Sequence, residues 1–142
     1  MRVESLWHLE KLENIPTQRQ GAQIRCVWNY HLIVEFWKCP FENLAEVKIV
    51  EEGLKYAING SNEIRIFSYQ FEPFGVSAQI SDGVTHIYIH TWPENGYSAI
   101  DIIAKTKEDS YRVLQRLQEA FLPQYVCAVE VPRGIMEEWG ET

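Results

Sequence analysis

The spacing of apolar residues changes along the chain, and each change marks the start of a new predicted element. From about Ile24 to Trp37 the residues are mostly β-branched, aromatic or otherwise apolar, which predicts a strand that ends at Cys39-Pro40. Between residues 44 and 57 apolar side chains recur three or four positions apart, which predicts a helix with one buried face. Asn59-Gly60 supplies the cap expected at the carboxyl end of this helix.

Four short strands are predicted after this helix. They lie near residues 63–71, 74–81, 84–90 and 97–104. The sequence Ser81-Asp82-Gly83 separates the second of these strands from the third and is typical of a tight turn. The two strands are therefore expected to pair as an antiparallel hairpin.

A second helix is predicted after the fourth of these strands. Thr106 and Asp109 have the spacing of a capping box, and apolar residues follow at helical spacing until Pro123 ends the helix. The apolar stripe of this helix consists of Tyr111, Leu114, Leu117 and Phe121. A last strand, from about Tyr125 to Val131, completes the series.

This order of elements predicts an α+β fold. We expect a two-layer sandwich in which a largely antiparallel sheet carries both helices on one face. The other face of such a sheet has to be covered or solvated, and 13% of the residues are aromatic. A partner subunit is therefore expected to cover that face.

The two ends of the chain differ from the predicted domain. Residues 1–22 are interpreted as an appendage, with a short amphipathic helix around residues 6–12, a stop at Ile15-Pro16 and a linker. The domain itself is expected to span residues 23–133. Residues 134–142 form an acidic tail.

Size and charge exclude several classes of protein. A chain of 142 residues is long enough for one domain with a buried core. Its formal charge of −7 argues against a nucleic acid or an anionic membrane as the main partner, because both require a basic surface. The three cysteines have no disulfide or metal-ligand spacing, and neither a signal peptide nor an apolar span is present. We expect a cytoplasmic protein.

Three polar side chains in the third short strand share one face. His86, Tyr88 and His90 alternate with isoleucines, so their side chains point the same way. Two imidazoles on one face can serve as a metal site or as an acid–base pair, or they can simply form a half-buried polar face. Because no cysteine or carboxylate is spaced to complete a ligand set, we expect no metal.

Two residues near this strand could contact a ligand. Glu94 lies in the loop after the strand, where its carboxylate could accept hydrogen bonds from two sugar hydroxyls or remain solvated. Phe71 could stack on a planar ring or belong to the core. The residue pattern alone does not choose between these alternatives.

Longer runs in the same region resemble a known family. The runs are Tyr30 to Phe36, Phe71 to Ser77, and Thr85 to Asp101, the last of which contains His-Thr-Trp-Pro-Glu-Asn-Gly-Tyr. They closely resemble the bacterial S-adenosylmethionine decarboxylase proenzyme family. The resemblance extends over about residues 28 to 130. It implies the fold of that family and a place in polyamine and spermidine biosynthesis.

The resemblance also implies a lyase mechanism that depends on a self-made cofactor. Family members cleave their own backbone before a serine, which becomes a pyruvoyl group that forms a Schiff base with the substrate amine. By position, Ser77 matches the processing serine and His90 the processing histidine. Phe71 matches an adenine-stacking phenylalanine, and Glu94 matches a ribose-binding glutamate.

Two other positions of the family pattern are substituted. Val84-Thr85 stands where the family has the glutamate and serine of the cleavage point, and Lys105 stands in place of the proton-donor cysteine. We therefore expect no pyruvoyl cofactor and no decarboxylation. The chain would bind a nucleoside-type or amino-acid ligand as a homodimer, or pair with a paralogous subunit.

Two alternatives remain open. In the first, Thr85 replaces the serine and the chain cleaves itself at Val84-Thr85, which would give a bulkier 2-oxobutyroyl group and an active decarboxylase. The β-branch of threonine restricts χ1, so its hydroxyl is less able to reach the preceding carbonyl carbon. In the second, His86, His90 and Lys105 form a new acid–base set for another reaction.

Overall fold

The computed structural model describes residues 3–4, 22–60, 63–134 and 136–139. Its strands are β1 (Val3–Glu4), β2 (Ala22–Cys26), β3 (Asn29–Trp37), β4 (Arg65–Gln70), β5 (Val76–Ser81), β6 (His86–Trp92), β7 (Tyr97–Ala104), β8 (Tyr125–Arg133) and β9 (Met136–Trp139). Its helices are α2 (Phe41–Leu44), α3 (Val47–Ile58) and α4 (Lys107–Phe121), with a 3-10 turn η1 (Pro93–Asn95). The helix predicted around residues 6–12 lies outside the described residues.

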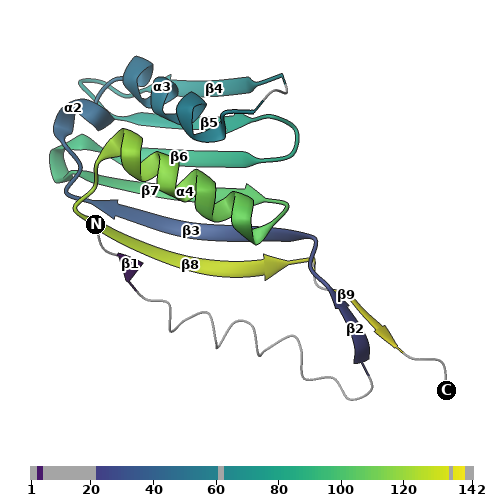
Figure 1. Cartoon of the computed structure of the whole chain (residues 1–142). Coiled ribbons are helices and arrows are strands. Elements are labelled where there is room, and N and C mark those ends of the chain that lie inside the picture. The colour runs from purple at the N-terminus through teal and green to yellow at the C-terminus, as the bar shows by residue number, and fades with distance from the viewer. Residues whose placement is uncertain (1–2, 5–21, 61–62, 135, 140–142) are drawn as a thin grey trace.

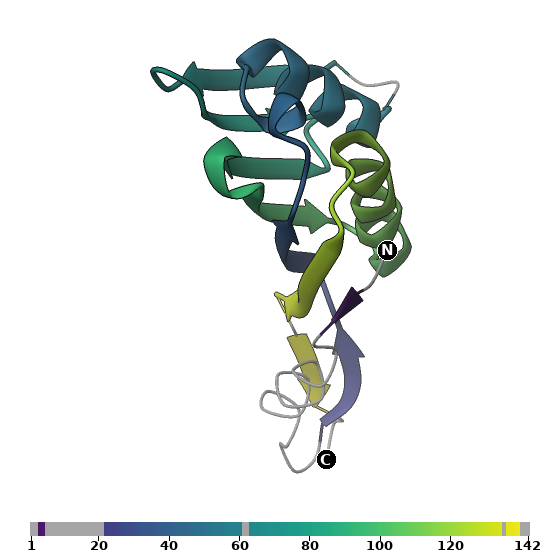
Figure 2. The same cartoon turned by 90° about the vertical axis from the view of Figure 1, so that its left-hand side faces the viewer.

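Seven strands form one sheet with the order β1-β8-β3-β7-β6-β5-β4. Neighbouring strands are antiparallel except β1 and β8, which are parallel. Helices α3 and α4 lie side by side across one face of this sheet (Figures 1 and 2). The predicted α+β sandwich, with a largely antiparallel sheet and helices on one face, is confirmed.

Alternation along the strands separates the two faces of the sheet. In β6 the side chains of Ile87, Ile89 and Thr91 are buried beneath the helices, whereas Tyr88, His90 and Trp92 point the other way and are exposed. The same alternation buries Leu32, Val34 and Phe36 in β3, and Ile100 and Ile102 in β7. We call the face opposite α3 and α4 the open face, because no described element covers it.

Both predicted helix caps are present. The backbone N–H of Asp109 donates to the Thr106 side-chain oxygen at 3.1 Å, at the start of α4. Asn59 adopts a left-handed conformation at the end of α3. Between the helices there is no room for a side chain at Gly53, because a Cβ atom there would lie 2.6 Å from the Phe121 ring.

The predicted helix over residues 44–57 is interrupted at its start, and a distant side chain explains the break. The Gln70 side-chain oxygen accepts from Val47 N–H at 2.7 Å, and its nitrogen donates to Ala45 C=O at 2.9 Å. These bonds satisfy backbone groups between α2 and α3 that a continuous helix would use internally. The sequence pattern does not predict this break because Gln70 comes from the end of β4.

The predicted strand over residues 24–37 is divided between two sheets. Its first part, β2, pairs with β9, while β3 pairs with β7 and β8. We call β2 and β9 the arm, since Figure 1 shows them projecting beyond the ends of β3 and β8. Part of the predicted acidic tail is thus a strand.

Within the described residues, no helix is long and apolar enough to cross a membrane.

One buried carboxylate links the sheet to α4. The Glu130 side chain of β8 is 1% exposed, and neither carboxylate oxygen has a hydrogen-bond partner among the described residues. The Lys107 ammonium, which is 55% exposed, lies 3.4 Å from one of these oxygens. An ion pair at this position offsets part of the cost of burying the carboxylate.

Replacing Lys107 with methionine is expected to destabilise the fold by about 2 kcal/mol at neutral pH, since a buried charge then loses its counter-charge. The free energy of unfolding in urea measures this loss. Lys105→Met, which changes an exposed lysine in the same segment, is the control and should have little effect. Adding Glu130→Gln to Lys107→Met should restore part of the stability. A Lys107→Met protein as stable as the control would contradict this account.

Candidate functional site

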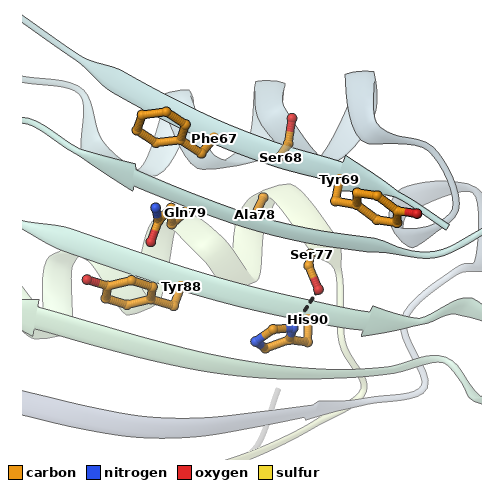
Figure 3. Close-up of a pocket in the computed structure, with 8 residues that line it drawn as sticks. All are labelled: Phe67, Ser68, Tyr69, Ser77, Ala78, Gln79, Tyr88 and His90. Atoms are coloured by element: carbon orange, nitrogen blue, oxygen red, sulfur yellow. Dashed lines mark hydrogen bonds between the residues drawn. The ribbon is translucent and has the colours of Figure 1, made fainter.

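A serine and a histidine face each other across two strands of the open face. Ser77 of β5 lies opposite His90 of β6 in the antiparallel pairing. The Ser77 Oγ atom lies 2.7 Å from His90 Nδ1, as the dashed line in Figure 3 shows. When the imidazole carries its proton on Nε2, the serine hydroxyl donates to Nδ1 and the Nε2–H group remains available.

Aromatic side chains surround one side of this pair. A hollow of about 390 Å³ on the open face is lined by Phe67, Ser68, Tyr69, Ser77, Ala78, Gln79, Tyr88 and His90. Figure 3 shows Phe67 and Tyr88 on either side of Gln79, with Tyr69 toward the Ser77 end. Phe67 and Tyr69 are 65% and 63% exposed, so these rings are available for contact. We call this the aromatic hollow.

A second hollow begins on the other side of the same pair. It also measures about 390 Å³ and is lined by Phe71, Phe74, Gly75, Val76, Ser77, His90, Thr91, Trp92 and Glu94. We call it the loop hollow, because it lies between the Phe71–Gly75 turn and the loop after β6. Phe71, Ser77, His90 and Glu94, the four candidate residues that match the family pattern, thus surround a single cavity.

The loop that carries Glu94 is fixed by backbone contacts. The Thr91 hydroxyl accepts from Val76 N–H at 2.9 Å and donates to Leu44 C=O at 2.8 Å. After η1, Gly96 has a φ of +61°, and its carbonyl accepts from Cys39 N–H at 2.9 Å. A Cβ atom at Gly96 would lie 3.0 Å from the Cys39 carbonyl oxygen, so this position requires glycine.

The turn that carries Phe71 is also closed by hydrogen bonds. Phe71 N–H donates to Gly75 C=O at 2.8 Å, and Gly75 N–H donates to Ala45 C=O at 3.0 Å. The Gln70 amide nitrogen lies 3.1 Å from Phe71 C=O and 3.0 Å from Gly75 C=O. The Phe71 ring packs edge-on against Tyr69, with 4.9 Å between the ring centroids. Both walls of the loop hollow are therefore held by ordered backbone.

Thr85 and Lys105 lie at the opposite end of the sheet. Thr85 precedes β6, five residues before His90, which corresponds to about 17 Å along an extended strand. Lys105 follows the last residue of β7, and the pairing of His86 with Ile103 places it at the same end as Thr85. Of the four candidate catalytic residues, the structure brings Ser77 and His90 together but leaves Thr85 and Lys105 distant from them within one chain.

A third hollow of about 280 Å³ adjoins Thr85. Its lining comes from the β5–β6 turn, the carboxyl end of α3 and the first turns of α4. The lining residues are Ile58, Asn59, Gly60, Asp82, Val84, Thr85, Asp109, Arg112, Val113 and Arg116. We call it the turn hollow. Its charged groups are partly engaged with each other, since Arg112 pairs with Asp109. The Arg116 guanidinium lies over the Tyr56 ring, 5.5 Å from its centroid.

His86 and Tyr88 share the open face with His90, as predicted. His86 lies opposite Ser81 and Ile103, and Tyr88 lies opposite Gln79 and Asp101. Across the part of the chain that the structure describes, no three His, Cys, Asp or Glu side chains are close enough to hold a metal ion. The histidines are four residues apart, or about 13 Å along the strand.

Sequence reasoning missed two polar contacts on the open face. His31 Nε2 donates to Asp101 Oδ1 at 2.8 Å, and the Tyr97 hydroxyl donates to Glu35 Oε1 at 3.0 Å. Burial and the bond to Glu35 raise the pKa of Tyr97 to about 12. The partners are 70 and 62 residues apart in the chain, so only the strand pairing brings them together. All four residues lie in the runs that resemble the family, and this resemblance was the signal in the sequence that could have pointed to them.

An aromatic row extends from the loop hollow across the open face. The Tyr97 ring lies 5.4 Å from the Trp92 ring and 4.4 Å from the Trp37 ring, measured between centroids.

On the other face of the sheet, Cys39 is buried, and burial raises the pKa of its thiol to about 12. Cys39 is therefore a structural residue and not a nucleophile at neutral pH.

Comparison with known proteins identifies the family. The family model for S-adenosylmethionine decarboxylase matches residues 30–134. The chain belongs to the S-adenosylmethionine decarboxylase family. The resemblance seen in the sequence is thereby confirmed. The matched span runs from the second residue of β3 to the end of β8, whereas β1, β2 and β9 lie outside it.

Relatives in this family cover most of the chain. The S-adenosylmethionine decarboxylase proenzyme of Thermotoga maritima is 34% identical over 113 residues, which are 78% of this chain and 87% of the relative. The proenzyme of Carboxydothermus hydrogenoformans is 37% identical over 79% of this chain and 91% of its own. The crystal structure of the Aquifex aeolicus adenosylmethionine decarboxylase superposes with a TM-score of 0.74 at 24% identity, covering 82% and 98% of the two chains. That structure supports the fold.

The residues at the β5–β6 turn do not fit the pyruvoyl group of an S-adenosylmethionine decarboxylase. Threonine keeps its methyl group, so Thr85 cannot become a pyruvoyl group. The backbone N–H groups of Val84 and Thr85 both donate to Asp82 Oδ1, at 2.9 and 2.7 Å. The Val84–Thr85 peptide is therefore held in a turn that Asp82 closes.

Proposed function

We propose that this S-adenosylmethionine decarboxylase homologue binds a nucleoside-type ligand in the loop hollow and neither makes a pyruvoyl group nor decarboxylates. One observation carries the proposal. The four candidate residues that match the family pattern surround one cavity, whereas the substituted positions, Thr85 and Lys105, lie together at the other end of the sheet. Ligand binding can therefore persist without the chemistry, and a role in polyamine metabolism follows from the family.

The loop hollow has groups suited to a nucleoside. The Phe71 and Trp92 rings can pack against a purine, and the Glu94 carboxylate can accept hydrogen bonds from two ribose hydroxyls. The Nε2 atom of His90 can form a polar contact with the remainder of the ligand, while Nδ1 is engaged by Ser77. The cavity volume of about 390 Å³ is within the usual range for small-molecule sites.

A second copy of the chain is the proposed partner for the open face. Aromatic and apolar side chains, including Ile33, Trp37 and Phe67, are exposed there. If two sheets stack face to face with their strands antiparallel, the β5–β6 turn of each copy approaches the loop hollow of the other. The two separated groups of candidate residues would then contribute to one composite site. A paralogous subunit could occupy the same position in place of an identical copy.

An active, self-processing decarboxylase is the second candidate function. The observation that favours it is the hydrogen bond of 2.7 Å between Ser77 and His90, the positions that match the family's processing residues. In this candidate, Thr85 attacks the Val84 carbonyl carbon in place of the family serine, and the substrate is S-adenosylmethionine or another amino acid. The mass of the purified chain distinguishes it from the first proposal.

Intact-protein mass spectrometry is expected to show one species near 16.6 kDa after long incubation at neutral pH. The chain should remain whole because Thr85 replaces the serine from which the cofactor is made. Two fragments that meet at Val84/Thr85 would refute the unprocessed state and support the second candidate.

Isothermal titration calorimetry with adenosine and S-adenosylmethionine tests the loop hollow. Phe71→Ala and Glu94→Gln should each weaken binding about tenfold, by removing a stacking surface and a charged acceptor. Tyr56→Ala, on α3 at similar exposure to Phe71 (48% against 47%), and Glu72→Gln are controls outside this cavity and should bind like the unchanged chain. Failure of both nucleosides to bind, or equal effects of the four variants, would count against the proposed ligand class.

Sedimentation equilibrium tests the second copy. The purified chain should have twice the monomer mass, and Ile33→Glu on the open face should shift it toward monomer, because a charge would be buried in the interface. Ile49→Glu, on α3 at similar exposure (40% against 45%), is the control. A monomer in the unchanged chain would leave the paralogous subunit as the partner.

A further inference from the structure

We infer that Asp82 holds the Val84–Thr85 peptide in a conformation that resists self-cleavage, so that the turn opposes processing independently of the missing serine. This inference rests on the proposed function, in which the chain is unprocessed. It goes beyond that function because it assigns a positioning role to a residue of the turn outside the family's catalytic pattern.

The turn is closed by four hydrogen bonds. Asp82 Oδ1 accepts from Val84 N–H at 2.9 Å and from Thr85 N–H at 2.7 Å. Asp82 N–H donates to Thr85 C=O at 3.2 Å, and Gly83 N–H donates to the Ser81 hydroxyl at 3.0 Å. Gly83 has a φ of +89°, a conformation that glycine adopts readily. Each backbone N–H from Asp82 to Thr85 therefore has a partner inside the turn.

Self-cleavage has to release one of these hydrogen-bonded nitrogens. The Thr85 Oγ atom would attack the Val84 carbonyl carbon, a C–O bond would form and the C–N bond to Thr85 would break. The hydroxyl proton is lost and the Thr85 nitrogen gains a proton, so the product is an ester with a free amine. The nitrogen that must leave is the nitrogen whose N–H donates to Asp82.

The hydrogen bond to Asp82 opposes this step in two ways. A carboxylate that accepts from an amide N–H strengthens the partial double bond of the C–N linkage and makes the carbonyl carbon less electrophilic. Thr85 N–H lies in the Val84–Thr85 peptide plane, so this plane cannot turn toward the Thr85 hydroxyl without breaking a charge-assisted bond, while the bond from Val84 N–H keeps the same carboxylate oxygen in place. Both effects would act on serine at position 85 as they act on threonine.

Restoring the family residues separates the effect of the turn from the effect of the threonine. Val84→Glu/Thr85→Ser re-creates the pair that the family has at its cleavage point, and Val84→Glu/Thr85→Ser/Asp82→Ala also removes the acceptor. Intact-protein mass spectrometry over several days at neutral pH gives the cleaved fraction. We expect the triple variant to cleave at least tenfold faster than the double variant. Asp82→Asn in the same background keeps a neutral acceptor and should give an intermediate rate.

Hydrogen exchange provides a second measurement that does not need cleavage. The Val84 and Thr85 amides should exchange slowly in the unchanged chain and at least tenfold faster in Asp82→Ala. Equal cleavage in the double and triple variants, an intact triple variant, or unprotected amides would each overturn the inference. An intact unchanged chain whose double and triple variants cleave equally fast would overturn only the role of Asp82, whereas cleavage of the unchanged chain would refute the proposed function as well.

Discussion

Helices α3 and α4 pack against one face of the sheet, and this one-sided packing divides the residues of each central strand into two sets. In β6 the isoleucines are buried under the helices, and Tyr88, His90 and Trp92 face the other way. The pairing of β5 with β6 then fixes Ser77 opposite His90. A one-residue shift of either strand would turn its own side chain, Ser77 or His90, toward the apolar core, so the register and the site are maintained together.

The sequence predicted the elements that depend on local patterns. The turn at Ser81-Asp82-Gly83, the cap at Thr106 and the shared face of the two histidines all follow from spacing over a few residues. Features that depend on distant partners were not predictable in this way. Examples are the break in the first helix, which Gln70 imposes from the end of β4, and the contact between His31 and Asp101. The arm was not predictable either, because it depends on the pairing of β2 with β9, which come from opposite ends of the chain.

The family resemblance predicted the candidate residues, but only the fold shows that they form two separate groups. Residue numbers suggest that Thr85 and His90 are neighbours, whereas an extended strand separates them by about 17 Å. Within one chain, this separation means that substitutions at positions 85 and 105 leave the lining of the loop hollow unchanged. The packing that orders Phe71 and Glu94 involves Thr91, Gly96 and Gln70, and none of these contacts involves the β5–β6 turn.

Gln70 has a consequence for how the protein can move. Its single amide group contacts the backbone on both sides of the helix break and also the carbonyls of Phe71 and Gly75. A displacement of the aromatic wall of the loop hollow must therefore strain the joint between α2 and α3. The first helix pair is mechanically coupled to the pocket entrance, and a fluctuation in one is transmitted to the other through one side chain.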